Sequence, residues 1–408
     1  MRDTRHTALP ATLLVGLLTA ALANPAAQAD GEWSGELAIE ARHFSERPAH
    51  SADWSDDASL ALDVEYYERL DDRHSLVVSP FLRADRRDEQ RSHADLREAF
   101  WHYYGDEFEL RAGIGQVFWG VTESRHLVDV INQTDFVESP DGEDKLGQPM
   151  LHLILPTDIG NLELFWLPYF RERTFAGDDG RPRPALPVDV DDPVYESGRG
   201  RRHWDFAARF SRSFGIWDLG LSQFSGTARE PRLVPTFDAA SASLSLAPHY
   251  DLVSRSGIDL QATVDAWLWK LEAIQQRADL RGNHSEAVAG VEYTFFDMRG
   301  SGADLGLIAE YLYDGRGADA DQPFQDDLML GLRLALNDVQ SSEALFGVIA
   351  DLDGGGHSLA LEASRRLGDD FTLDFELRAT EDVATAEDPQ LAAFAHTDFA
   401  RLQLSWYF

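Results

Sequence analysis

The chain of 408 residues contains no cysteine, and its 36 lysines and arginines are outnumbered by 71 aspartates and glutamates. The missing cysteine excludes a disulfide framework. The formal charge of −35 argues against a nucleic-acid partner, which needs a clustered basic surface. After the first thirty residues, no apolar run reaches the roughly 18 residues of a membrane-spanning helix. The length allows one large domain or two ordinary domains without disulfides.

The first 29 residues have the pattern of a cleaved secretory signal. Arg2 and Arg5 precede an apolar run that begins at Ala8, and Ala27-Gln28-Ala29 offers the small-x-small sequence that a signal peptidase cleaves. A membrane anchor is the alternative, but the apolar run of roughly 16 residues is shorter than a membrane span. We therefore predict a signal peptide at 1–29 and a single exported domain at 30–408.

The C-terminal residues alternate strictly between the two sides of an extended chain. A period of two with aromatic residues at the end places one face in hydrocarbon and the other in a polar medium. The pattern resembles the assembly signal that the barrel-assembly machinery recognises in Gram-negative outer-membrane β-barrels. The edge strand of a soluble β-protein is the alternative. The apolar residues of this signal are Leu402, Leu404, Trp406 and Phe408.

The same alternation recurs along the whole exported chain. Two packed sheets would also alternate, but they seldom need so many long strands of one type. We predict an all-β transmembrane antiparallel up-and-down barrel of about 18 strands, or 16 if a segment near 149, 228–263 or 353–356 is miscounted. The expected strands lie near 33–44, 58–70, 74–86, 93–104, 107–118, 149–156, 160–170, 202–213, 216–227, 249–263, 265–277, 285–297, 302–314, 325–337, 342–352, 356–367, 370–381 and 396–408.

The predicted connections alternate between tight turns and mostly longer segments, as periplasmic turns and external loops do in such barrels. The third external loop, 119–148, is the most distinctive. In general porins the third loop folds into the barrel and narrows it, so we expect the same here, with a short helix over 123–131. An external lid that never enters the lumen is the alternative.

Aromatic residues lie near many predicted strand ends, including Trp101, Trp119, Trp166, Trp217 and Trp406. Amphipathic rings at both membrane interfaces would account for this placement. Ordinary packing of large side chains is the alternative.

An 18-strand barrel is wide enough to hold an aqueous channel. In the set of residues that the alternation directs inward, acids outnumber bases, so we expect a weak preference for cations. A general acidic bias, as in salt-adapted proteins, would give the same excess without selectivity. The candidate pore residues are Glu123, Arg125, Asp129, Asp135 and Glu138 on the loop and Glu109, Arg111, Arg209 and Arg333 on the wall.

Several short motifs resemble a large, poorly characterised family of proteobacterial outer-membrane proteins. These motifs are Arg97-Glu98-Ala99-Phe100, Gly113-Ile114-Gly115-Gln116 followed by Trp119-Gly120, and Val128-Asp129-Val130-Ile131-Asn132-Gln133-Thr134-Asp135. The similarity is best over 93–170 and from Pro248 to Lys270. The resemblance implies an exported barrel and no defined substrate.

Signs of an enzyme are weak. The sequence contains no Gly-x-Ser-x-Gly, His-Glu-x-x-His or Walker motif, so we predict no catalytic residues, no metal and no cofactor. A barrel hydrolase that pairs His152 or His203 with a serine is an alternative. Calcium binding at Asp189–Asp192 or Asp351–Gly354 is another, although neither segment matches the full loop pattern.

The sequence favours a porin-like channel for passive diffusion of small hydrophilic solutes or ions. The alternatives are a selective transporter of hydrophobic compounds and a non-transport envelope barrel such as an adhesin, an anchor or a hydrolase. The first alternative would need an apolar lumen and an N-terminal plug. The expected location is the outer membrane, and the expected partners are its lipid and lipopolysaccharide, the assembly machinery, small solutes and, in a homotrimer, two further copies of the chain.

Overall fold

The computed structural model describes residues 31–46, 54–184, 186–238, 243–320, 323–353, 355–381 and 397–408. The predicted signal peptide at 1–29 and the predicted external loop at 382–395 lie outside these residues.

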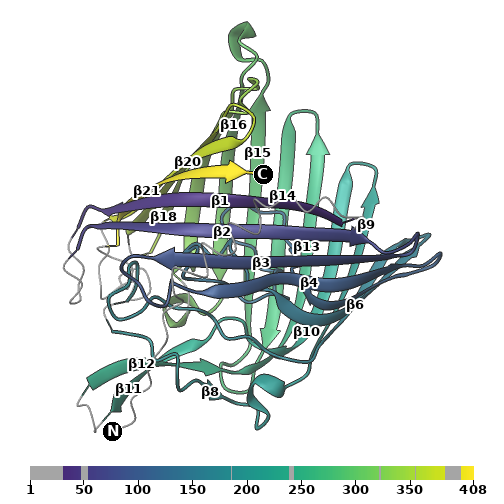
Figure 1. Cartoon of the computed structure of the whole chain (residues 1–408), viewed down its shortest axis with the longest axis vertical. Helices are drawn as coiled ribbons and strands as arrows, with labels where there is room; N and C mark the ends of the chain where they lie inside the picture. The colour runs from purple at the N-terminus through teal and green to yellow at the C-terminus, as the bar shows by residue number, and fades with distance from the viewer. Residues whose placement is uncertain are drawn as a thin grey trace.

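Within the described ranges, eighteen antiparallel strands form one closed sheet (Figure 1). Each strand pairs with its neighbour in the chain, so the predicted 18-strand up-and-down barrel is confirmed. The barrel strands are β1 (Gly31–Phe44), β2 (Asp56–Arg69), β3 (His74–Asp85), β4 (Ala94–Tyr104), β5 (Glu109–Gly115), β6 (Gln148–Thr157), β7 (Gly160–Leu167), β9 (Asp205–Phe214), β10 (Trp217–Thr227), β13 (Leu252–Val264), β14 (Trp267–Arg277), β15 (His284–Phe295), β16 (Asp304–Asp314), β17 (Asp326–Ala335), β18 (Glu343–Asp351), β19 (His357–Leu367), β20 (Phe371–Glu381) and β21 (Phe399–Tyr407).

A second, smaller sheet lies beside one end of the barrel (Figure 1). It contains β8 (Val194–Tyr195), β11 (Arg232–Asp238) and β12 (Ser243–Tyr250). This sheet explains the ambiguous segment 228–263, which holds an extra hairpin before the barrel resumes at β13. We call the end with the long connections external and the end with the short turns periplasmic.

The barrel closes where β1 pairs with β21. The register runs from Glu36 opposite Tyr407 to Phe44 opposite Phe399. Phe408 extends the ladder, because its backbone N–H donates to the Gly35 carbonyl at 3.0 Å and its carbonyl accepts the Gly35 N–H at 3.0 Å. The sheet therefore has no free edge at this seam, and its backbone groups are satisfied without water.

The outer face of the barrel is apolar, as the alternation predicts. Leu330, Leu402 and Trp269 are each about half exposed, while Glu272, on the inner face of the same strand as Trp269, is fully buried. An apolar outer surface on a closed barrel is the architecture of an outer-membrane protein. Among the described residues, no helix is long and apolar enough to cross a membrane.

Most of the aromatic residues at strand ends face outward, but Trp119 does not. Its side chain is buried and packs edge-to-face on Phe165, with ring centroids 5.5 Å apart, inside the barrel. The prediction that Trp119 joins an interfacial girdle is wrong. The chain leaves β5 at Gly115 and turns inward, so Trp119 follows the loop and not the wall.

The interior has an apolar region made by strands from β6 to β17. Inward residues such as Met150, Phe165, Phe224, Ile274 and Ile308 form its wall. Loop residues complete the same buried cluster: Trp119, Leu127, Val128, Val130 and Ile131. This side of the lumen is therefore filled with side chains.

Candidate functional site

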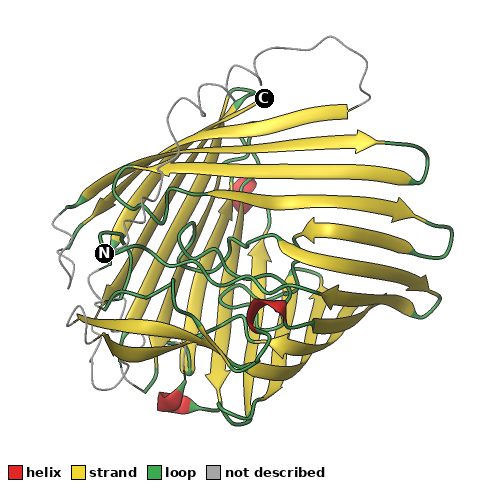
Figure 2. Cartoon of the chain, turned by 60° about the horizontal axis from the view of Figure 1, so that its bottom comes forward, coloured by secondary structure: helices red, strands yellow, loops and turns green. Residues whose placement is uncertain are grey.

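The segment 116–147 between β5 and β6 contacts inward-facing residues on widely separated strands. Figure 2 shows loops lying inside the ring of strands. The first half of the segment contacts β14, β15 and β16, and the second half contacts β1, β3, β4 and β20. We call this segment the cross-lumen loop.

Two wall carboxylates hold the first half of the cross-lumen loop. Glu272 on β14 accepts the backbone N–H groups of Val121 at 2.7 Å, Thr122 at 3.1 Å and Val128 at 3.2 Å. Glu310 on β16 accepts the N–H groups of Glu123 and Ser124, both at 2.8 Å. Hydroxyls of Thr122 and Ser124 add bonds of 2.8 and 2.6 Å. Hydrogen bonds to a charged acceptor are stronger than neutral ones, so these two carboxylates are firm anchors.

The predicted short helix over 123–131 is wrong. The described residues of this stretch form turns and bends without a helix. The N–H of Val128 donates to Glu272, whereas in a helix it would donate to the carbonyl of residue 124. The wall carboxylates thus compete with local helix formation, while the apolar side chains still become buried.

Ion pairs hold the second half of the cross-lumen loop. Asp135 lies 2.8 Å from Arg97 of β4, and Glu138 lies 2.6 Å from Arg83 of β3. Farther along, Asp141 pairs with Arg378 of β20. These contacts join the loop to strands from both ends of the chain.

The motif Val128 to Asp135 supplies the fixed points of the loop. Asn132 donates to the carbonyls of Gly115 at 2.9 Å and Leu146 at 2.8 Å, so it ties the two ends of the loop together. Asp129 lies 3.1 Å from Lys145. These residues are buried and hold the loop in place.

The predicted pore residues are spread over several ion pairs. The structure brings Glu123 and Arg333 together at 2.5 Å. The other predicted residues have separate partners: Arg125 pairs with Glu286 at 2.8 Å, Arg209 with Asp259 at 2.7 Å, Glu109 with His102 at 3.1 Å, and Asp129, Asp135 and Glu138 as given above. Arg111 has no ion pair within the described residues and lies 5.7 Å from the Phe100 ring centroid. Most of the loop acids are thus neutralised by bases.

An arginine cluster surrounds Glu40 of β1 and was not predicted from the sequence. Glu40 is buried and lies 2.9 Å from both Arg42 and Arg91, 3.5 Å from Arg83 and 3.8 Å from Arg401. The inward excess of acids is therefore smaller in this region than the alternation predicts.

Arg97, which pairs with Asp135, was also missed as an inward residue, because β4 contains a bulge. Ser79 pairs with Glu98 and Pro80 with Leu96, which leaves Arg97 as the extra residue. A bulge reverses the alternation, so a strict period of two assigns the wrong faces beyond it. Arg97 would have been found only by testing shifted registers.

Five inward carboxylates toward the periplasmic end have no ion pair with any described residue. On β1, the inward residues Arg42, Glu40 and Ala38 are buried, whereas Glu36 is partly exposed. The lumen below the cross-lumen loop is therefore open to solvent along this wall. The five residues, named here the acidic wall, are Glu36, Asp63, Glu65, Glu98 and Asp374.

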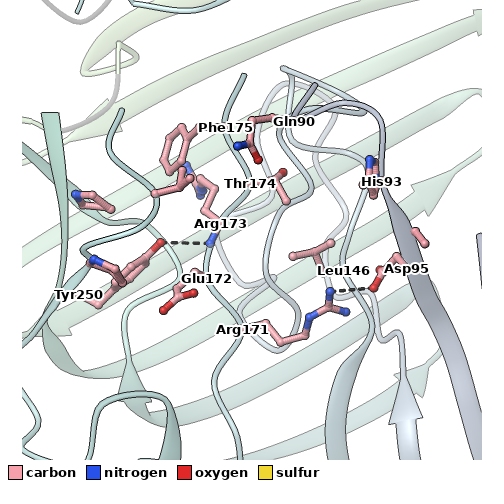
Figure 3. Close-up of a pocket in the computed structure, with 14 residues that line it drawn as sticks. Gln90, His93, Asp95, Leu146, Arg171, Glu172, Arg173, Thr174, Phe175 and Tyr250 are labelled. Carbon is pink, nitrogen blue, oxygen red and sulfur yellow. Dashed lines mark hydrogen bonds and ion pairs between the residues drawn. The ribbon is translucent and has the colours of Figure 1, made fainter. Parts of the chain in front are cut away.

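A pocket of about 270 Å³ lies at the external mouth (Figure 3). It is formed where the segments 90–95 and 171–175 meet the end of β12. Leu146 of the cross-lumen loop also lines it, so the pocket adjoins the route into the lumen. We call it the mouth pocket.

The protonation of His126 makes the stability of the cross-lumen loop depend on pH. Burial lowers the pKa of His126, but the carboxylates of Glu143 and Glu272, which lie 3.3 and 3.9 Å from its ring nitrogens, outweigh burial and raise that pKa to about 10. A raised folded-state pKa stabilises the protein fully below the ordinary value of 6.5, and this stabilisation is lost as pH rises through about 10. We expect single-channel current noise to increase from pH 7 to pH 10 as the loop loosens.

The control for this effect is His126→Gln, which cannot titrate. Its current noise should change little over the same pH range. An equal rise in the variant and the natural chain would contradict the role of His126.

The histidines considered above for a hydrolase contact carboxylates, and a group of carboxylates that could hold a metal contacts an arginine. His152 lies 2.8 Å from Glu163, and His203 lies 2.8 Å from Asp205. In the described part of the chain neither histidine has a hydrogen bond to a serine. Among the described residues, the carboxylates of Asp141, Glu362 and Glu376 converge within 4.8 Å, but Arg378 contacts all three.

No model of a protein family matches the chain, and no curated protein matches it. Solved structures match over 93% of the chain. A BenF-like porin from Pseudomonas fluorescens Pf-5 is 10% identical with a TM-score of 0.55, and the match covers 98% of it. OccAB3 of Acinetobacter baumannii is 9% identical with a TM-score of 0.56, and the match covers 99% of it.

A third match is OccK2 (OpdF) of Pseudomonas aeruginosa, solved in complex with glucuronate. It is 11% identical with a TM-score of 0.54, and 99% of it is covered. Identities this low show the fold, which is that of outer-membrane porins. The resemblance to the poorly characterised family stays a prediction.

Proposed function

We propose that the protein is an outer-membrane channel for passive diffusion of small hydrophilic solutes or ions, with a weak preference for cations. The porin fold and the solvent-exposed lower lumen support a channel. We further propose that the cross-lumen loop is the constriction, and that the channel works without a cofactor or a chemical step. Lipopolysaccharide, the assembly machinery and a homotrimer remain proposed partners.

The acidic wall carries the proposal of cation preference. The ion pairs of the cross-lumen loop cancel most of its charge, so the loop itself contributes little to selectivity. Unpaired carboxylates in a narrow, partly desolvated passage concentrate cations and repel anions. Glu36 and Asp63 lie directly opposite each other on β1 and β2, which strengthens the local field.

The test is the reversal potential of the refolded protein in a planar bilayer under a KCl gradient. The natural chain should give a cation-leaning reversal potential. Glu36→Gln/Asp63→Asn/Glu98→Gln removes three carboxylates of the acidic wall and should move the reversal potential toward zero.

The matched control removes three exposed carboxylates from periplasmic turns, as Asp71→Asn/Asp72→Asn/Asp106→Asn. Exposed charges are screened by salt, so the control should shift the reversal potential less. A folded protein that never conducts would overturn the channel. Equal shifts in the two variants would overturn the role of the acidic wall.

A selective transporter of hydrophobic compounds is the second candidate. The apolar region between β6 and β17 is the observation that favours it. That region is occupied by the apolar residues of the cross-lumen loop, so an apolar solute would have to displace them. The diffusion channel needs no such displacement, and we prefer it for that reason.

A further inference from the structure

Arg171 and Glu172, which line the mouth pocket, form ion pairs with neighbouring residues, whereas Arg173 forms none with any described residue. Arg171 lies 2.7 Å from Asp95 and donates to the Gly147 carbonyl at 2.9 Å. Glu172 pairs with Arg201 and accepts the hydroxyl of Tyr195. These two charged residues of the pocket are thus neutralised by neighbours, and Figure 3 shows the pairing of Arg171 with Asp95.

Arg173 is the exception. Its guanidinium has no ion pair with any residue that the structure describes, and its one hydrogen-bond contact is with the side-chain oxygen of Gln133 at 3.5 Å. Its backbone N–H donates to the hydroxyl of Tyr250 at 3.1 Å, which fixes the chain at this point. A guanidinium offers five N–H donors, so most of its capacity is unused.

The surroundings of Arg173 leave its guanidinium partly accessible to the pocket. Burial lowers the pKa of Arg173 below its ordinary value, although the charge of Glu230 opposes this shift. A carboxylate that docks on the guanidinium would supply the ion pair that Glu230 does not make and would form two parallel hydrogen bonds.

The other walls of the pocket fit a small hydroxylated body. Gln90 and Thr174 supply polar groups, and Phe175, Pro193 and Pro248 supply flat apolar surfaces. The volume of about 270 Å³ is below the range of pockets for drug-sized ligands, so the occupant is small.

We propose that the mouth pocket binds a small hydroxylated carboxylate, about the size of a sugar acid, and that Arg173 pairs with its carboxylate group. The inference rests on the proposed function, because the pocket would then capture a solute beside the channel entrance. Leu146 belongs to both the pocket and the cross-lumen loop, so the captured solute would contact the constriction element directly. The acidic wall lies toward the other end of the lumen and acts on ions separately.

The test is isothermal titration calorimetry of the refolded protein in detergent, with galacturonate and galactose as probes. The two probes share a ring and differ at the carboxylate. Galacturonate should bind, and galactose should bind about tenfold more weakly or not at all, because it lacks the charge-assisted bonds. Equal affinities, or no binding of galacturonate, would overturn the proposal.

Variants assign the binding to Arg173. Arg173→Gln should abolish galacturonate binding, and Arg173→Lys should weaken it because lysine keeps the charge but loses the planar fork. Arg202→Gln removes an exposed arginine outside the pocket and should leave binding unchanged. Retained binding in a folded Arg173→Gln protein would overturn the assignment.

Conductance separates this inference from the proposed function. A protein that conducts but does not bind galacturonate overturns the capture site alone. A protein that binds galacturonate but never conducts overturns the diffusion channel and leaves the capture site standing.

Discussion

Single-channel conductance should rise severalfold when Glu272 and Glu310 are both replaced by alanine. Together the two carboxylates accept seven hydrogen bonds from the first half of the cross-lumen loop. Each bond to a charged group contributes about 1.5–3 kcal/mol, and the remaining contact from β14, Lys270 with Glu123 at 3.5 Å, is a single ion pair that cannot replace them. Once released, residues 121–131 would leave the lumen, and the passage would widen.

The measurement is conductance in a planar bilayer, with heat-modifiable gel mobility as evidence that the barrel has folded. The control is Glu163→Ala, which removes an inward carboxylate that contacts His152 and not the loop. Its conductance should match that of the natural chain. Unchanged conductance in the double variant would remove the cross-lumen loop from the constriction.

Stability, in contrast, should depend most on Glu40. Its carboxylate is about 1% exposed and is shared by the guanidinium groups of Arg42, Arg83, Arg91 and Arg401. Removing one partner of a buried ion pair costs about 3–5 kcal/mol, because the remaining charge is left uncompensated. Glu40→Gln should therefore lower the urea midpoint of unfolding in lipid vesicles by a wide margin.

Glu36→Gln provides a matched control on the same strand and the same face. Glu36 has no ion pair with a described residue and lies opposite another acid, Asp63. Its loss should leave the urea midpoint unchanged or raise it slightly, since a repulsion disappears. Similar losses of stability in both variants would show that the arginine cluster does not depend on Glu40.

The barrel was predictable from sequence because its governing period is short and local. Leu402, Leu404 and Trp406 define one face by adjacent residues alone, and no distant contact is needed to recognise the strand. The same holds for Leu328 to Leu334 on β17. The hydrophobic environment outside the barrel imposes this period on every strand.

The site was less predictable, because its chemistry depends on distant partners. Nothing in the sequence near Glu123 indicates Arg333, and nothing near Glu138 indicates Arg83, so the neutralisation of the loop acids was missed. The prediction of a helix over 123–131 was wrong for the same reason. The carboxylate of Glu272, on a strand far along the chain, accepts the backbone N–H of Val128 that a helix would need. Neighbouring residues in the sequence predict only which side chains face inward, and not what those side chains contact.

The pairing of Asp141 with Arg378 has a consequence for folding kinetics. These residues are 237 positions apart, and Glu123 and Arg333 are 210 apart. Contacts of such high sequence separation form late, because loop-closure entropy must be overcome first. The cross-lumen loop therefore completes its contacts only after β17 and β20 are in place. During refolding we expect a wide, noisy pore to precede the narrow one, with docking of the loop as a separate slow phase.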